Sequence, residues 1–182
     1  ENDIRPQRGS LTLSFANVAA YQSFDADNPG ASRFVDEDFN RLWSDEILDG
    51  PRQSVELTRA REIRRVVAEA DYLLDLHSMH LPCPPLMLCG TAPKGRRLAF
   101  AMGVPEHVVA DPGHAAGPRM RDYGRFVPVD AEQTALLIEC GQHWAAATGQ
   151  VAIEAAFHFL DALGLVEKDI ASPYLVATPS SQ

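Results

Sequence analysis

Several features that mark common classes of protein are missing from this sequence. It has no run of about 18 apolar residues, so no membrane span is expected. Basic residues are outnumbered, with 16 Lys and Arg against 25 Asp and Glu, and they form no continuous run. The resulting net charge of -9 argues against nucleic acid or an anionic membrane as the partner.

Cysteine is also scarce, and Cys83, Cys89 and Cys140 form no C-x-x-C pair. An odd number of cysteines without a disulfide framework is typical of a reducing compartment, so we expect a cytoplasmic protein with free, buried or half-buried thiols. The sequence has no G-x-S-x-G, P-loop or G-x-G-x-x-G motif. No motif therefore supports a serine hydrolase or a nucleotide-binding protein.

Apolar runs alternate with amphipathic segments along the chain. The runs are apolar throughout, which is typical of a sheet covered on both faces. We predict one α/β domain over residues 1–182, a three-layer, mostly parallel or mixed sheet with helices on both faces, with 165–182 as an edge segment or tail. Expected strands or short apolar runs are 9–18, 71–77, 84–90, 106–111 and 134–141; expected helices are 54–69, 92–103 and 149–164, with a short helix near 37–47 in a long loop.

The stretch DYLLDLHSMH contains a candidate metal ligand. Asp75 and His77 point to the same face of a strand, and a carboxylate so placed orients a metal-binding imidazole. The alternative is a core histidine paired with its neighbour. His80, which follows the strand, is a weaker candidate.

Glu139 ends the apolar run LLIE. Burying a carboxylate costs several kcal/mol unless it is paired, so a glutamate here is unusual and suits a general base acting on water. The alternative is a strand-end residue that reaches solvent. Cys140 and His143 follow, but no positioned base or oxyanion motif supports a thiol nucleophile.

Two arginine-rich segments are candidates for binding a carboxylate or polarising a carbonyl. A guanidinium presents a fork of donors that matches a carboxylate. Solvated loops held by their own Arg–Asp pairs, or a solvated turn, are the alternatives. The candidates are Arg33, Asn40 and Arg41 in SRFVDEDFNRLW, and Arg119, Arg121 and Arg125 in GPRMRDYGRF.

Taken in order, four segments resemble the succinylglutamate desuccinylase/aspartoacylase family. They are Asn28-Pro29-x-Ala31, Ser32–Arg41, Asp75-Leu76-His77 and Ile138-Glu139-Cys140-Gly141, and the resemblance runs from about residue 11 to 164. It implies a zinc-carboxypeptidase-like fold and zinc-dependent hydrolysis of the amide bond of a small N-acyl amino acid. The implied partner is that small-molecule substrate, and a homo-oligomer is left open.

The resemblance also implies a role for individual residues. His77 would bind zinc, with Asp75 as the carboxylate that orients it. Glu139 would be the general base and Arg33 would polarise the carbonyl. Asn40 and Arg41 would hold the substrate, and an arginine for its carboxylate would be Arg119, Arg121 or Arg125.

The chain departs from the family in one important respect. The family supplies two further zinc ligands from an N-terminal His-x-x-Glu, whereas the first histidine here is His77. We therefore expect a chain that lacks its N-terminal strand and zinc-binding turn, and that is inactive as printed because a catalytic zinc needs three protein ligands. The alternatives are a carboxypeptidase-like zinc hydrolase acting on peptides or cell-wall amides, and a non-catalytic binding domain that has lost the metal site.

Overall fold

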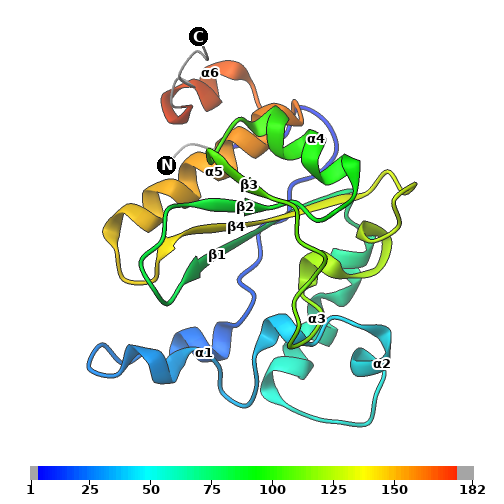
Figure 1. The fold of residues 1–182 in the computed structure, drawn as a ribbon, viewed down its shortest axis with the longest axis vertical. Coiled ribbons are helices and arrows are strands. Elements are labelled where there is room, and N and C mark those ends of the chain that lie inside the picture. The colour runs from blue at the N-terminus through cyan, green and yellow to red at the C-terminus, as the bar shows by residue number, and fades with distance from the viewer. Residues whose placement is uncertain (1–3, 176–182) are drawn as a thin grey trace. The chain divides into compact units, whose positions relative to one another are not determined.

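A computed structural model describes residues 4–175 and divides into two compact units (Figure 1). The first unit contains the described residues of Glu1–Thr12, Tyr72–Pro112 and Thr134–Gln182. The second contains Leu13–Asp71 and Gly113–Gln133. Over the described residues, no helix combines the length and apolarity needed to cross a membrane.

The first unit is built on a four-stranded mixed sheet in the order β1-β4-β2-β3. β1 runs parallel to β4, β2 runs parallel to β3, and β2 is antiparallel to β4. The strands form where apolar runs were predicted, which confirms an α/β fold with a mixed sheet. Their bounds are β1 Tyr72–Met79, β2 Leu86–Leu88, β3 His107–Val109 and β4 Thr134–Gln142.

Two helices, α4 (Pro93–Met102) and α5 (Ala146–Ala162), pack together on one face of this sheet (Figure 1). Their side chains form a core with alternate residues of β4, namely Leu136, Ile138 and Cys140. The sequence predicted helices on both faces of the sheet, but within this unit the described helices cover one face only. Gly103 ends α4 at a φ of 71°, as expected for a glycine that closes a helix.

The carboxyl end of α5 supports the last described segment. Phe157 and Leu160 pack against α6 (Lys168–Ala171) and η5 (Ser172–Tyr174), and the Phe157 and Tyr174 rings stack with centroids 3.8 Å apart. Ile153, nearer the start of this helix, is 45% exposed. The part of the expected tail at 176–182 lies outside the described residues.

The second unit is formed by α3 (Val55–Glu69) and the loops around it. Ser54 caps α3 by accepting the N–H of Leu57, a role that serine commonly has at this position. Trp43 is 1% exposed and makes edge contacts with Phe39 and Tyr123 at centroid distances of 5.7 and 5.6 Å. The other elements are α1 Val18–Gln22, η1 Pro29–Ser32, η2 Phe39–Arg41, α2 Asp45–Leu48, η3 Met120–Asp122 and η4 Gly124–Phe126.

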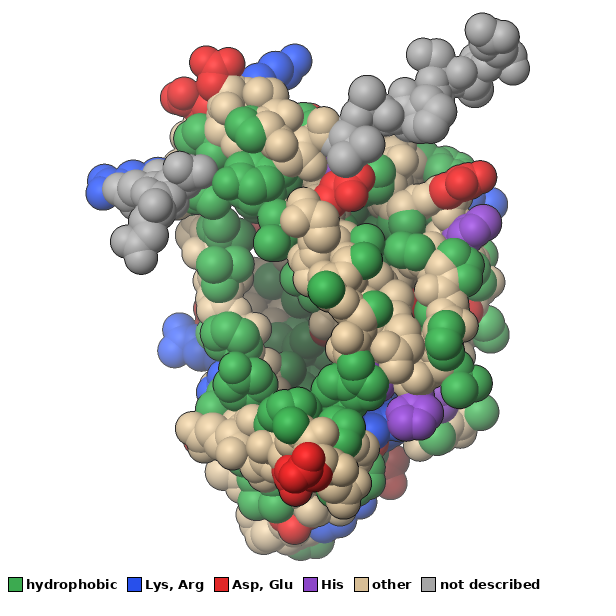
Figure 2. Space-filling view, turned by 90° about the vertical axis from the view of Figure 1, so that its left-hand side faces the viewer, with side chains coloured by type: hydrophobic (Ala, Val, Ile, Leu, Met, Phe, Trp, Pro, Cys, Tyr) green, Lys and Arg blue, Asp and Glu red, His purple; other side chains and the backbone are tan. Residues whose placement is uncertain are grey.

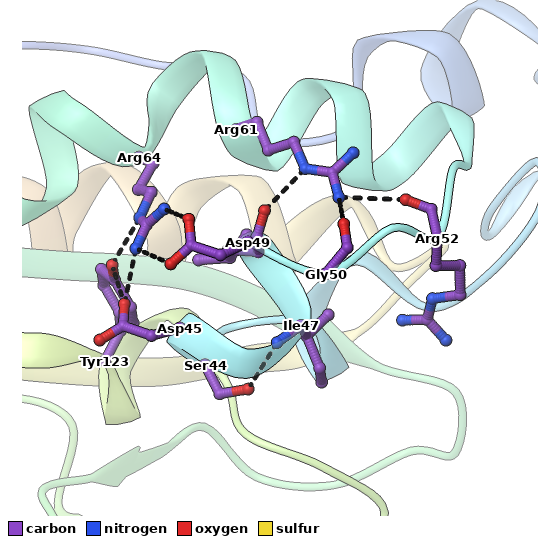
Figure 3. A network of polar contacts seen from close by, with 10 residues as sticks. Ser44, Asp45, Ile47, Asp49, Gly50, Arg52, Arg61, Arg64 and Tyr123 are labelled. Atoms are coloured by element: carbon purple, nitrogen blue, oxygen red, sulfur yellow. Dashed lines mark hydrogen bonds and ion pairs between the residues drawn. The ribbon is translucent and has the colours of Figure 1, made fainter.

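A polar network ties α2 to α3 (Figure 3). Arg64 on α3 donates to Asp45, Asp49 and the hydroxyl oxygen of Tyr123, and that hydroxyl donates to Asp45 at 2.8 Å. Hydrogen bonds that Arg64 donates to Asp49 and Tyr123 raise the pKa of Arg64, so it stays charged. Arg61 donates to three backbone oxygens between residues 48 and 52. These two arginines fix the loop that follows α2.

The strand predicted at 9–18 does not form. Residues 10–15 have no ladder partner among the described residues, and α1 begins at Val18 with Asn17 as its cap. Arg59 instead donates to the backbone oxygens of Phe15 and Ala16, which occupies backbone groups that a strand would use. Leu13 and Phe15 are 86% and 80% exposed. Figure 2 shows many hydrophobic side chains on the face that it draws.

Candidate functional site

The first unit places His77 directly opposite Glu139. Tyr72 through His77 of β1 pair in parallel register with Thr134 through Glu139 of β4. Adjacent strands lie about 4.8 Å apart, and residues in register share a face, so the two side chains are neighbours although 62 positions separate them in sequence. They lie on the face opposite the α4–α5 core, because Ile138 and Cys140 point into that core.

Asp75 holds the His77 ring from the same strand. Its Oδ1 lies 2.8 Å from His77 Nε2, and Asp75 is only 6% exposed. The second oxygen, Oδ2, is buried and accepts no hydrogen bond within the described part of the chain. Because Nε2 contacts Asp75, a metal bound by His77 would bind to Nδ1. This carboxylate–imidazole arrangement is the one that commonly orients a metal-binding histidine.

The Glu139 side chain lies in a mostly apolar position. All residues from Thr134 to Cys140 except Glu139 are buried. Glu139 is half-buried, and its Oε2 atom is inaccessible to solvent. Leu86 of β2 is its register partner on the other side. A carboxylate placed in this way is suited to accept a proton from a water molecule.

At the carboxyl ends of β1 and β4 lies a pair that sequence reasoning missed. Ser78 Oγ and His143 Nδ1 are 2.7 Å apart, and the His143 backbone N–H donates to Met79 O at 2.9 Å. The ring of His143 makes edge contacts with those of His80 and Trp144. These contacts join the turn after β4 to the end of β1, just after a register shift between His77 and Met79.

The first unit does not assemble a complete metal site. No group of three or more His, Cys, Asp or Glu side chains able to hold a metal ion occurs among residues 4–175. All three cysteines are free, as predicted. Burial, and then the charge of Glu139, raise the pKa of Cys140 to about 11, so its thiol is neutral near pH 7.

The second unit gathers Arg33, Asn40 and Arg41 around Asp38. Arg33 Nη2 lies 2.9 Å from Asp38 Oδ2, and Arg41 Nη2 lies 3.8 Å from the same oxygen. The other Asp38 oxygen accepts the backbone N–H of Asn40 at 3.0 Å. This pairing is the local Arg–Asp arrangement that composition also predicted, so the ion pair alone does not distinguish a binding loop from a structural one.

Glu56 on α3 fixes the loop before these residues. It is 0% exposed and accepts backbone N–H groups from Val35, Asp36 and Glu37, together with the Asn17 side-chain amide. Burial raises the pKa of Glu56, but the hydrogen bonds outweigh it and hold the pKa below its ordinary value. Sequence reasoning missed this residue, because a glutamate in the first turn of a helix is ordinary there.

The second arginine-rich segment joins the first within this unit. Asn40 Oδ1 accepts the backbone N–H of Met120 at 2.8 Å, which places Arg119 and Arg121 next to the Asn40 segment. Both arginines are buried and pair with Asp122. Arg125 is exposed in η4. Of the three arginines proposed for the substrate carboxylate, Arg119 and Arg121 are therefore beside Asn40 in the fold.

His114 lies just before this segment, and the sequence did not single it out. Its Nε2 lies 3.1 Å from Arg41 Nη2.

Comparison of the chain with protein-family models, with curated proteins and with solved structures found no match.

Proposed function

We propose that this chain belongs to a zinc-dependent hydrolase that cleaves the amide bond of a small N-acyl amino acid. The observation that carries the proposal is the placement of His77 beside Glu139 in the β1–β4 register, with Asp75 bonded to His77 Nε2. One strand thus supplies an oriented imidazole and its neighbour supplies a carboxylate. This is the combination that metal-assisted hydrolysis uses for a ligand and a general base.

The described residues fit one position of a zinc site but not the whole of it. The Asp75–His77 pair has the chemistry of a zinc ligand with an orienting carboxylate. A catalytic zinc needs three protein ligands, and no three candidate ligands gather among residues 4–175. The proposal therefore requires zinc ligands beyond this set. Zinc, when bound, would acidify a water molecule and polarise the amide carbonyl.

The chain's own contribution to the chemistry centres on Glu139. Its carboxylate would accept a proton from the attacking water as the oxygen adds to the amide carbonyl. The same proton would pass to the leaving nitrogen when the C–N bond breaks, which releases a carboxylic acid and a free amine. The buried neighbours of Glu139 in β4 limit the access of bulk water to this carboxylate.

Donors for an anionic substrate are available in the second unit. Arg33, Asn40, Arg41, Arg119 and Arg121 offer guanidinium and amide groups on a protein whose net charge is -9. Asp38 pairs with Arg33 and Arg41, and Asp122 pairs with Arg119 and Arg121. Guanidinium groups suit a substrate that carries a carboxylate, as an N-acyl amino acid does.

The test uses the protein encoded by the complete reading frame that contains residues 1–182. Zinc content is measured by mass spectrometry, and release of free amine is measured with a panel of N-acyl amino acids and short peptides. We expect His77→Ala to lose zinc, and Glu139→Gln to keep zinc but lose turnover by about a thousandfold or more. His107→Ala, at an exposed position on β3, is the matched control.

The outcomes separate the candidate functions. Turnover of peptides in preference to N-acyl amino acids would indicate the carboxypeptidase-like alternative. A full-length protein with neither zinc nor turnover would indicate a non-catalytic binding domain. Unchanged zinc content in His77→Ala would show that the assignment of the ligand is wrong.

A further inference from the structure

Three aromatic rings meet at the carboxyl ends of β1 and β4, in the first unit. The centroid of the His143 ring lies 6.0 Å from that of His80 and 5.5 Å from that of Trp144, and both contacts are edge-on. Edge contacts are a favoured arrangement of aromatic rings. His80 directly follows β1, and His143 and Trp144 directly follow β4. These three rings form an aromatic cluster at the end of the sheet to which His77 and Glu139 also belong.

Hydrogen bonds fix the aromatic cluster to the two strands. The His143 N–H donates to Met79 O at 2.9 Å, and Ser78 Oγ lies 2.7 Å from His143 Nδ1. The Trp144 N–H donates to Gln142 Oε1 at 2.9 Å. The position of the cluster is therefore set by the same strand ends that carry the candidate zinc ligand and the candidate base.

The aromatic cluster offers apolar surface to solvent. Trp144 is 50% exposed, His80 is exposed, and Leu81, the next residue along the chain, is 69% exposed. The other tryptophan, Trp43, is 1% exposed and belongs to the second unit. A large aromatic side chain gains free energy when a ligand covers it, so an exposed indole beside a candidate site is available for binding an apolar group.

The segments that form this end of the sheet contain no lysine or arginine. They are residues 78–83, with the sequence SMHLPC, and residues 140–145, with the sequence CGQHWA. Asp75 and Glu139 instead contribute carboxylates on the face of the sheet that His77 shares. A ligand group with its own carboxylate would find no guanidinium or ammonium group on these segments to pair with.

The lysines and arginines of the first unit lie towards the opposite end of the sheet. β2 is antiparallel to β4, so the carboxyl end of β2, which leads into α4, lies towards the amino end of β4. α5 starts beside the aromatic cluster and, with 17 residues, ends about 25 Å away (Figure 1). The basic residues described in this unit precede or begin α4, or lie near the far end of α5: Arg5, Arg8, Lys94, Arg96, Arg97 and Lys168.

We propose that the aromatic cluster binds the acyl group of the substrate, and that this acyl group is uncharged and aromatic. The inference rests on the proposed hydrolysis, because it specifies the substrate of that same site. An acyl group such as succinyl, which has a carboxylate of its own, would be disfavoured by the lack of cations at this end of the sheet. The carboxylate of the amino acid would lie away from the cluster for the same reason.

The first experiment measures binding to the ¹⁵N-labelled protein encoded by the complete reading frame. The protein is titrated at pH 8, where an unperturbed imidazole is neutral, with phenylacetamide and with succinamate. These primary amides carry a neutral aromatic and an anionic acyl group. We expect phenylacetamide to bind about tenfold more tightly and to shift the indole N–H signal of Trp144 but not that of Trp43. Affinities are taken from the backbone signals of residues 141–145, so an anion bound elsewhere does not contribute.

Variants of the exposed indole test whether the cluster is the binding site. Trp144→Ala should weaken phenylacetamide binding about tenfold, whereas Trp144→Phe should retain most of the affinity because it keeps an aromatic ring. Phe100→Ala is the matched control, since it removes a 65% exposed ring from α4. Succinamate binding that equals or exceeds that of phenylacetamide would overturn the inference. Phenylacetamide affinity that is unchanged in Trp144→Ala would also overturn it.

The second experiment measures turnover of N-phenylacetyl, N-acetyl and N-succinyl derivatives of one amino acid by the same protein. We expect the highest kcat/KM for the N-phenylacetyl substrate. Trp144→Ala should lower that value about tenfold more than it lowers the value for the N-acetyl substrate. A lack of turnover with all three would contradict the proposed hydrolysis. Turnover that favours the N-succinyl substrate would leave the hydrolysis standing and overturn the inference about the acyl group.

Discussion

The carboxylates of Asp36 and Glu56 join the first turn of α3 to the loop before it. The Asp36 N–H donates to Glu56 Oε2 at 3.0 Å, and Asp36 Oδ2 accepts the N–H of Val55 at 2.7 Å, at the first residue of α3. The helix terminus and the loop that carries Arg33 are therefore held by the same two carboxylates. This pairing attaches a charged loop to the first turn of the helix through hydrogen bonds to the backbone.

Glu56→Gln should destabilise the protein by about 1–3 kcal/mol at pH 7, because it removes a buried charged acceptor of several N–H groups. The pKa of Glu56 is lower in the folded than in the unfolded protein, so its stabilisation is present above the unfolded pKa and is lost as the pH falls through the folded value. Urea unfolding at pH 7 and at about pH 3 measures this difference.

The variant should therefore lose less stability on acidification than the unsubstituted protein does. Glu106→Gln, at an exposed position, is the control and should unfold like the unsubstituted protein at both pH values. Parallel pH dependence in Glu56→Gln and the unsubstituted protein would contradict the role given to this carboxylate.

Arg64→Ala should be clearly destabilising, by about 1–3 kcal/mol, whereas its neighbour Arg65→Ala should change stability by less than about 0.5 kcal/mol. Arg64 joins Asp45, Asp49 and Tyr123 (Figure 3), but Arg65 makes a single surface pair with Glu69. Thermal unfolding of the two variants gives the comparison. Equal melting temperatures would show that the network adds nothing beyond a surface ion pair.

Asp75→Asn should weaken zinc binding to the full-length protein about 10- to 100-fold, because the amide no longer provides the carboxylate that orients His77. Equilibrium dialysis against a zinc buffer measures the affinity. Asp130→Asn, at an exposed position, is the matched control. An Asp75→Asn protein that binds zinc as tightly as the unsubstituted one would show that His77 needs no such partner.

Cys140 should resist alkylation at pH 8, because a thiol with a pKa of about 11 is only about one part in a thousand thiolate there. Cys83, which is half-buried, should react first with iodoacetamide. Peptide mass spectrometry after timed quenching identifies the modified residue. Faster modification of Cys140 than of Cys83 in the folded protein would contradict the described burial.

Local patterns predicted most of the elements. The apolar runs at β1 and β4 and the capped, amphipathic α3 carry their structure in their own residues, and the pattern found all three. The pattern also found Asp75 and His77 on one strand face. It could not show that Glu139 would be the register partner of His77, because strand pairing depends on contacts far apart in the sequence.

The predictions that failed also depended on contacts between distant parts of the sequence. LTLSF reads as a strand, but a strand needs a neighbour, and Arg59 occupies the backbone oxygens of Phe15 and Ala16. Glu56 was missed because its significance lies in backbone N–H groups supplied by another segment. A sequence displays side chains, whereas the acceptors and donors of the main chain become visible only once the chain is folded.

The register that pairs His77 with Glu139 sets a limit on how β4 can vary. A strand alternates its faces with every residue, so one residue inserted between Thr134 and Ile138 would turn Glu139 towards the α4–α5 core and bring a core residue to His77. Two inserted residues would restore the alternation. Length variation in this strand is therefore expected to occur in steps of two, or to be confined to the turn after Gln142.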